Sequence, residues 1–336
     1  MDPISLALLG AALALVGGVV YLANAAALDP ARLPLLRSVL GLITLLMAAL
    51  AVPVMFSLAS DTPETAASAY AGAGVAAAAA AFSIGALNSP RFRSGLSRLF
   101  GERYNANSPV HLAALVLTAS LLSYTVVNLV AGGGVEGLAE TIEQGGVAAG
   151  ETLFQSVLWV LAALLGVGLF LRRSPADMLN RLGLRMPGPL DVATGLGAGL
   201  LLYGAVLAMT AAWATLASPD WMSEGSSVAA ALAESVTSLP EALLLSLPVA
   251  IGEEIFFRGA LQPVFGLVPT ALYFAGLHAQ YGLTPALLSV FIVGLGFGLL
   301  AKRRGTVTAI LAHFVYNFVQ LMLVLLASSM LPAGGV

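Results

Sequence analysis

The sequence contains no cysteine among its 336 residues. Disulfide bonds, thiolate nucleophiles and cysteine-ligated zinc sites are therefore excluded. Charge is also scarce, because Asp, Glu, Lys and Arg together make up 9% of the chain, whereas soluble domains carry roughly 25%. This is too little charge to cover a soluble surface, and the formal net charge of −3 argues against nucleic acid as a partner.

Apolar residues, in contrast, make up 59% of the chain, and the mean hydropathy is +0.95. Apolar runs of about 20 residues are long enough to cross a bilayer as helices. The first run begins after Asp2 and lacks a positively charged leader, so we interpret it as a retained transmembrane helix and not as a signal peptide. Ten such segments lie near 4–27, 38–59, 67–87, 110–132, 153–171, 190–215, 240–261, 268–280, 285–301 and 306–329. The expected fold is all-α, a polytopic bundle of about ten spanning helices.

The loops between these segments alternate in charge, which predicts their orientation. Three loops are basic, with Arg91, Arg93, Arg98 and Arg103, then Arg172, Arg173, Arg181 and Arg185, then Lys302, Arg303 and Arg304. The loops between them carry acidic residues: Asp61 and Glu64, then Glu136, Glu140 and Glu143, then Asp220 and Glu224. Since basic loops stay cytoplasmic, both termini are expected on the outer side of the plasma (inner) membrane. Membrane lipid is the surrounding partner, and we expect a monomer.

Two further patterns bear on packing. Runs of small residues such as "GLGAGLL" (195–201) suit close helix contacts in lipid. Segment 216–239 is expected to include a short interfacial helix before the seventh span. No repeat at a fixed period is visible, which weakens an inverted-repeat transporter interpretation.

Ionisable residues appear in one stretch that otherwise resembles buried helix, "VAIGEEIFFRGAL" (249–261). Charges at membrane depth are costly and rarely persist without a partner or a function. With basic loops inside, Glu253 lies about 10–15 Å below the cytoplasmic boundary. His278 and His313, two of only three histidines, are expected at similar depth on other helices. A purely structural ion pair is the simpler alternative, but matching depth on three helices favours a functional site.

Spacing within the helices separates the roles of these residues. Glu254 and Arg258 are four residues apart and share a helix face, so they are expected to pair. Glu253 projects about 100° away and can face another partner. His313 and Asn317 also share a face, and Phe274 shares one with His278.

Two chemistries fit this set of residues. A buried carboxylate beside an imidazole can activate water, while a histidine and an amide stabilise an oxyanion. Alternatively, Glu253, His278 and His313 match the ligand count of a catalytic zinc site with an open position. Both routes lead to amide hydrolysis, and neither HExxH nor GxSxG is present. The sequence leaves open whether the cofactor is absent or is a single divalent metal such as zinc.

Three motifs occur in order: "EEIFFR" (253–258), "FAGLH" (274–278) and "HFVYN" (313–317). They resemble the EExxxR, FxxxH and HxxxN/D signatures of the CAAX-protease and bacteriocin-processing (CPBP, Abi) family of intramembrane proteases. The resemblance covers roughly residues 150–330. It implies that Glu253 and His278 activate or ligate the water, that His313 and Asn317 form the oxyanion site, and that Glu254 and Arg258 are a supporting pair.

The resemblance also implies two parts of the chain and a function. Residues 1–150 would be N-terminal transmembrane helices of unassigned role, and residues 151–336 a CPBP-like protease domain. The expected function is hydrolysis of a peptide bond in a membrane-tethered or lipidated peptide or protein, in a polar-lined cavity reached from the cytoplasmic side. The alternatives are a proton- or ion-coupled transporter, which could use the same groups as a relay, and a non-catalytic immunity or scaffold protein.

Overall fold

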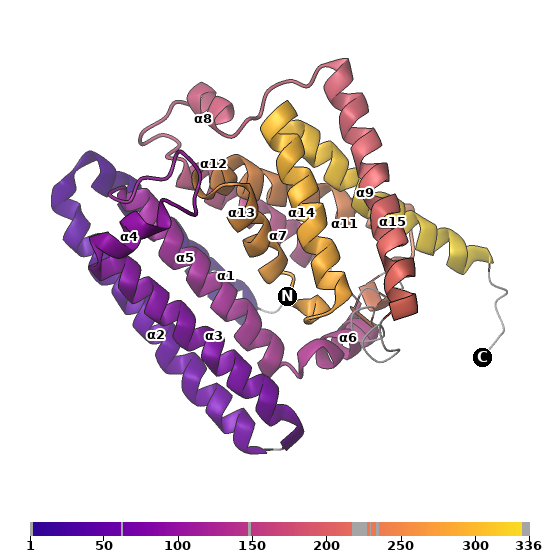
Figure 1. Ribbon diagram of the computed structural model, residues 1–336, viewed down its shortest axis with the longest axis horizontal. Coiled ribbons are helices and arrows are strands. Elements are labelled where there is room, and N and C mark those ends of the chain that lie inside the picture. Colours follow the sequence, from indigo (N-terminus) through magenta and orange to yellow (C-terminus); the bar gives the residue numbers. More distant parts are fainter. Residues whose placement is uncertain are drawn as a thin grey trace.

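The computed structural model describes residues 3–61, 63–146, 149–216, 227–228, 230–232 and 235–330. Within those ranges the regular structure is helical throughout, without a strand (Figure 1). An all-helical chain satisfies each backbone N–H and C=O inside its own segment, as lipid requires. The expected all-α helical bundle is confirmed.

The long helices are α1 (Pro3–Leu28), α2 (Leu33–Asp61), α3 (Pro63–Asn88), α5 (Pro109–Ala131), α7 (Ala149–Gly166), α9 (Pro189–Leu216), α11 (Leu239–Glu253), α14 (Pro285–Arg304) and α15 (Thr306–Met330). Shorter elements are η1 (Pro30–Arg32), α4 (Pro90–Leu96), α6 (Gly134–Gly145), α8 (Pro175–Arg181), η2 (Glu254–Leu261), α12 (Gln262–Phe265), α13 (Leu267–Gly276) and η3 (Ala279–Tyr281). Many begin with proline at the first turn, where the missing N–H costs nothing.

Six helices of the described chain are long and apolar enough to span a membrane. They correspond to α2, α3, α5, α9, α14 and α15. Of the other four expected segments, 4–27 corresponds to α1 (Pro3–Leu28), and the remaining three are helical but shorter or interrupted. The segment expected at 153–171 ends at Gly166, and the one at 268–280 ends at Gly276. The count of ten spans and the outer position of the termini stay predictions. The interfacial helix expected within 216–239 falls mostly outside the described residues.

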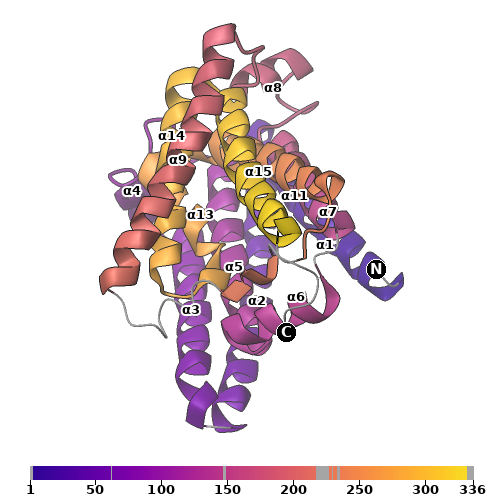
Figure 2. The same cartoon turned by 90° about the vertical axis from the view of Figure 1, so that its right-hand side faces the viewer.

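The helices form two groups that lie side by side (Figures 1 and 2). One group packs α2, α3 and α5 together; the other packs α9 and α14 against α15, and α11 between α7 and α15. The largest buried apolar cluster joins both groups, with Leu36, Leu40 and Val116 from the first and Phe257 and Phe274 from the second. The division at residue 150 stays a prediction, and these two parts share one core.

Small residues allow a close helix contact between α9 and α15. A Cβ added at Gly195 would lie 2.8 Å from Leu311 Cβ, and one at Gly199 would lie 2.5 Å from the carbonyl oxygen of Ala312. Gly197, on the other face, has nothing within 4 Å. The packing role expected for "GLGAGLL" is therefore confirmed for two of its three glycines.

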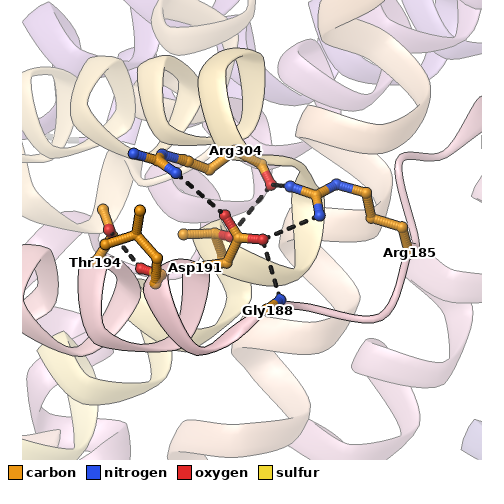
Figure 3. A network of polar contacts seen from close by, with 7 residues as sticks. Arg185, Gly188, Asp191, Thr194 and Arg304 are labelled. Atoms are coloured by element: carbon orange, nitrogen blue, oxygen red, sulfur yellow. Dashed lines mark hydrogen bonds and ion pairs between the residues drawn. The ribbon is translucent and has the colours of Figure 1, made fainter.

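The three basic loops meet at one end of the bundle. Asp191, at the start of α9, joins two of them: its Oδ2 lies 3.0 Å from Arg185 Nη1, and its Oδ1 lies 3.7 Å from Arg304 Nη1 (Figure 3). The amide of Gly188 donates to Asp191 Oδ2 at 3.1 Å, and Arg185 Nη2 donates to the Arg304 carbonyl at 2.6 Å. We call this end, with the loops 91–103, 172–185 and 302–304, the basic end. The alternation of loop charge predicts that the three basic loops share one end, as they do here. That this end is cytoplasmic stays a prediction.

Candidate active site

The two adjacent glutamates stand at a change of helix type. Glu253 is the last residue of α11, and Glu254 begins η2, a stretch of π-helix that continues to Leu261. The wider turn of a π-helix is rare and is found most often at functional sites. The sequence pattern predicts a regular α-helix here, because the periodicity of eight residues does not distinguish a π-helix from an α-helix.

Glu254 is fully buried and is held by two cationic or polar groups. Its Oε2 lies 3.2 Å from Arg258 Nε, and its Oε1 lies 2.9 Å from His313 Nδ1. The pairing of Glu254 with Arg258 expected from their spacing is therefore present. The contact of Glu254 with His313, 59 residues later in the chain, was not expected, because the sequence motifs predict an oxyanion role for His313.

Arg258 is buried among aromatic rings. Its guanidinium carbon lies 4.4 Å from the centroid of the Phe274 ring, and Nη2 donates to the Gly294 carbonyl at 3.2 Å. Nη1 is buried with no hydrogen-bond partner. A buried cation with incomplete hydrogen bonding depends strongly on its carboxylate, so Glu254 and Arg258 stabilise each other's burial.

Glu253 differs from its neighbour because it is only partly buried and, in the described part of the chain, its buried Oε2 has neither a hydrogen bond nor an ion pair, whereas Glu254 Oε2, which also lacks a hydrogen bond, is paired with Arg258. Within the described residues no ion pair to Glu253 is formed. An unpaired buried carboxylate oxygen is costly in a stable protein, and such groups are often functional. Glu253 is therefore the glutamate with acceptor capacity left for a water or a substrate.

His278 lies beyond the end of α13, in the turn that leads to η3. The expectation that a spanning helix carries it is wrong, because α13 ends two residues earlier, at Gly276. Its Nδ1 lies 2.8 Å from the Phe274 carbonyl oxygen. A carbonyl only accepts hydrogen bonds, so this contact assigns the proton to Nδ1 and leaves Nε2 of the neutral ring as an acceptor. The imidazole is thus oriented to receive a proton at Nε2.

His313 and Asn317 lie on α15 and line the same cavity of about 310 Å³. The ring of His313 stacks on Phe297 at 4.6 Å between centroids, which fixes its plane. With Nδ1 donating to Glu254, neutral His313 presents an acceptor at Nε2, and only the imidazolium form donates there. The amide of Asn317 donates in either state.

The cavity also contains His278, together with Tyr281 and Tyr316. Its walls come from the later part of α9, the first half of α14 and the middle of α15, with the turn after α13. Neither Glu253 nor Glu254 is part of its lining. At 1.5 Å per residue, His313 is about 10 Å along α15 from the basic end. The cavity therefore extends toward the opposite end of the bundle. The two tyrosines were missed from the sequence, although Tyr316 lies within the "HFVYN" motif.

Within the described chain, no group of three or more His, Asp or Glu side chains is placed to hold a metal ion. The alternative zinc ligands Glu253, His278 and His313 thus do not form a preassembled set. In both histidines Nδ1 already forms a hydrogen bond, to the Phe274 carbonyl in His278 and to Glu254 in His313.

Comparison with known proteins gives a family assignment over one part of the chain. Residues 235–319 match the family model "Type II CAAX prenyl endopeptidase Rce1-like". Over 88 residues the chain is 36% identical to the uncharacterized protein YpbD of Bacillus subtilis. That alignment covers 25% of this chain and 46% of the relative, so the chain matches about half of the relative's length. No solved structure matches. The motifs and this match agree: residues 235–319 are similar to the Rce1-like family of CAAX prenyl endopeptidases, and they lie within a multi-helix membrane protein.

Proposed function

We propose that this protein is an intramembrane endopeptidase that hydrolyses a peptide bond in a membrane-tethered or lipidated peptide or protein. The observation that carries the proposal is that two adjacent glutamates have different surroundings. Glu254 is buried and paired with Arg258 and His313, whereas Glu253 has a carboxylate oxygen without a partner. His278 and Asn317 lie in an adjoining cavity with His313.

In the proposed reaction, Glu253 accepts a proton from a water molecule, with the acceptor Nε2 of His278 orienting the same water. The hydroxide oxygen attacks the carbonyl carbon of the scissile bond, and the carbonyl oxygen becomes an oxyanion. The Asn317 amide and the imidazolium of His313 donate to that oxygen. The C–N bond then breaks, and the proton held by Glu253 passes to the leaving amine.

Glu254 and Arg258 act on this reaction through His313. The carboxylate of Glu254 accepts from Nδ1 at 2.9 Å, which fixes the orientation of the ring and leaves Nε2 for the substrate. Phe297 holds the ring plane by stacking. We therefore assign Glu254 and Arg258 positioning roles.

We also propose that the active site is reached from the cytoplasmic side of the plasma membrane, as the basic loops predict. A second hollow at the basic end is lined by Arg258 and Gln262, among other residues. The cavity with His278 and Asn317 extends toward the opposite end of the bundle. Labelling of single cysteines tests from which side this cavity is reached.

Cleavage by the purified protein tests the proposal. We expect wild-type protein in lipid vesicles to cleave members of a lipidated, membrane-tethered peptide library, and Glu253→Gln to cleave none of them. Proton-dependent flux into the vesicles without cleavage would instead support the transporter. Absence of both activities would support the immunity or scaffold alternative.

Metal dependence is tested with the same protein. Metal analysis of the purified chain is paired with cleavage after treatment with a chelator. We expect cleavage to continue after chelation, because Glu253 and His278 supply the acceptor groups for the water. Stoichiometric zinc whose removal abolishes cleavage would replace the glutamate scheme by the metal scheme.

A further inference from the structure

The hollow at the basic end, of about 500 Å³, concentrates positive charge. Its lining includes Arg103, Arg181 and Lys302, one residue from each basic loop, as well as Arg258. The only carboxylate in the lining is Glu102. We call this hollow the basic pocket. Because Arg258 is already neutralised by Glu254, three cations and one carboxylate remain to set its charge.

None of these three cations forms an ion pair within the described chain. Arg181 donates from Nη1 and Nη2 to the carbonyls of Gly259 at 2.7 Å and Ala260 at 3.2 Å. A guanidinium has five N–H donors, so part of its donor set stays available. Burial, and then the positive charges of Arg103, Arg173 and Arg172, lower the pKa of Arg181 to about 10. Like charges are thus held together here, and Glu102, the carboxylate of the lining, forms no ion pair with any of them among the described residues.

A helix N-terminus adds to the positive field of the basic pocket. Gly266 and Leu267, which line it, are the N-cap and first residue of α13. Gly266 has no side chain to cap the helix, so the N–H groups of Leu267 and Val268 carry the positive end of the helix dipole beside the pocket. Pro269, the next residue, has no N–H. Anions are the ligands that such a terminus attracts.

The wall that bears Arg103 is fixed in place. The amide of Gly101 donates to the Val264 carbonyl at 3.1 Å, which joins the loop after α4 to α12. A Cβ at Gly101 would lie 3.1 Å from the Gly266 nitrogen, so only glycine permits this approach without a shift. Arg103, two residues later, is therefore placed by the backbone, although its side chain is exposed.

From these observations we propose that the basic pocket binds the phosphate group of an anionic ligand. Arg forks and a Lys ammonium match phosphate geometry and charge, and the pocket lies where the basic loops would meet phospholipid headgroups. The phosphate can come from an anionic lipid or from a soluble phosphate. This site is distinct from the proposed catalytic cavity and does not depend on peptide cleavage.

Binding at the basic pocket also has a structural consequence for the active-site segment. Arg181 holds the carbonyls of Gly259 and Ala260, which lie within the π-helix that begins at Glu254. A phosphate on Arg181 would order this guanidinium and, with it, the end of η2. We expect bound ligand to slow amide hydrogen exchange in residues 259–265 of the wild-type protein.

Native mass spectrometry of the full chain in an uncharged detergent tests the proposal. The probes are dioleoyl-phosphatidylglycerol, dioleoyl-phosphatidylcholine and inorganic phosphate. We expect preferential retention of phosphatidylglycerol over phosphatidylcholine. The variant Arg103→Gln with Lys302→Gln should weaken retention about 25-fold, since each basic residue near an anionic surface contributes roughly fivefold. Both side chains are exposed, so the variant should fold normally.

The matched control is Arg98→Gln with Arg303→Gln, which removes the same charge from exposed positions on the same loops outside the pocket lining. Retention should fall far less in this control. Phosphatidylglycerol retention that inorganic phosphate does not displace identifies a lipid headgroup as the ligand. Displacement by millimolar phosphate, or binding of phosphate alone, identifies the soluble anion. No retention of any probe, or equal weakening in both double variants, would overturn the proposal.

Discussion

At the scale of single residues, Glu253 and Glu254 differ in what each carboxylate contacts. Glu254 lies between Arg258 Nε at 3.2 Å and His313 Nδ1 at 2.9 Å, so its charge is committed to holding those two groups. Glu253 carries a buried oxygen with no partner. Two identical side chains at adjacent positions therefore have different consequences when they are changed.

Glu253→Gln should abolish turnover and leave folding unchanged. The substitution keeps the side-chain volume but removes the proton acceptor, and base catalysis contributes roughly 10²–10⁴-fold in rate. Peptide cleavage and the midpoint of thermal unfolding, measured on one preparation, check this. Near-normal cleavage by Glu253→Gln would show that another group takes the proton.

Glu254→Gln should act mainly on stability. Removal of one partner of a buried ion pair costs about 3–5 kcal/mol, because the other charge remains buried and unpaired. We expect a lower unfolding midpoint and lower yield, partly restored when Arg258 is changed to Gln in the same chain. Restoration stays partial because His313 then contacts a neutral amide oxygen in place of the carboxylate. A well-folded, inactive Glu254→Gln protein would reverse the roles assigned to the two glutamates.

His278→Ala and His313→Ala should differ in their effect on stability. His278→Ala removes one hydrogen bond, to the Phe274 carbonyl, and ring contacts with Phe274 and Tyr281, and it should give a folded protein without activity. His313→Ala also leaves Glu254 Oε1 without its hydrogen bond, and a bond to a charged group contributes about 1.5–3 kcal/mol. Thermal unfolding of the two variants should therefore differ, while cleavage is lost in both. Equal unfolding midpoints would count against the contact between His313 and Glu254.

At the scale of elements, the packing of α9 on α15 is set by which glycine faces which helix. Gly199 lies against Ala312 and Val315, with added-Cβ distances of 2.5 Å and 2.8 Å to their nearest atoms. Gly197, two residues earlier on the same helix, faces open space. Alanine substitutions at Gly197 and Gly199 therefore distinguish the intrinsic helix preference of alanine from the effect of packing against α15, because both positions lie in the same helix.

Gly199→Ala should destabilise the bundle, since overpacking costs roughly 1–3 kcal/mol. It should also reduce cleavage, because α15 carries His313 and Asn317, and a shift of α15 would move both. Gly197→Ala is the control and should be neutral or slightly stabilising, as alanine favours a helix by about 0.5–1 kcal/mol over glycine. The measurement is the thermal unfolding midpoint of each single variant. Equal effects at both positions would contradict the close contact between α9 and α15.

At the scale of the whole molecule, the three basic loops share one end, while the cavity with His278 and Asn317 extends toward the other. The topology predicts that the shared basic end is cytoplasmic. The chain has no cysteine, so single cysteines report sidedness without background.

Arg98→Cys and Arg303→Cys should react with a membrane-impermeant maleimide only from the cytoplasmic side, and Glu140→Cys only from the outer side. Thr210→Cys, which lines the cavity, tests access to the active site. Labelling of Thr210→Cys from the cytoplasmic side would support the proposed route, and labelling from the outer side alone would reverse it. Labelling of Arg98→Cys and Arg303→Cys from the outer side would contradict the predicted orientation of the helices in the membrane.

The sequence by itself determined the helical class, the approximate helix positions, the alternation of loop charge and the ordered motifs around Glu253, His278 and His313. These are local properties: apolar runs, loop composition and spacing within one helix. The i, i+4 pairing of Glu254 with Arg258 followed from the same local geometry.

Only the tertiary structure decided which helix faces meet and what the site residues contact. In lipid, core-facing and lipid-facing side chains are equally apolar, as exposed Leu200 and Leu201 on α9 show, so the hydrophobic pattern does not identify the packed face. The contact of His313 with Glu254, the position of His278 beyond the end of α13, and the π-helix of η2 depend on how separate helices fit together. The basic pocket likewise exists because three loops, far apart in the chain, are brought to one end by that packing.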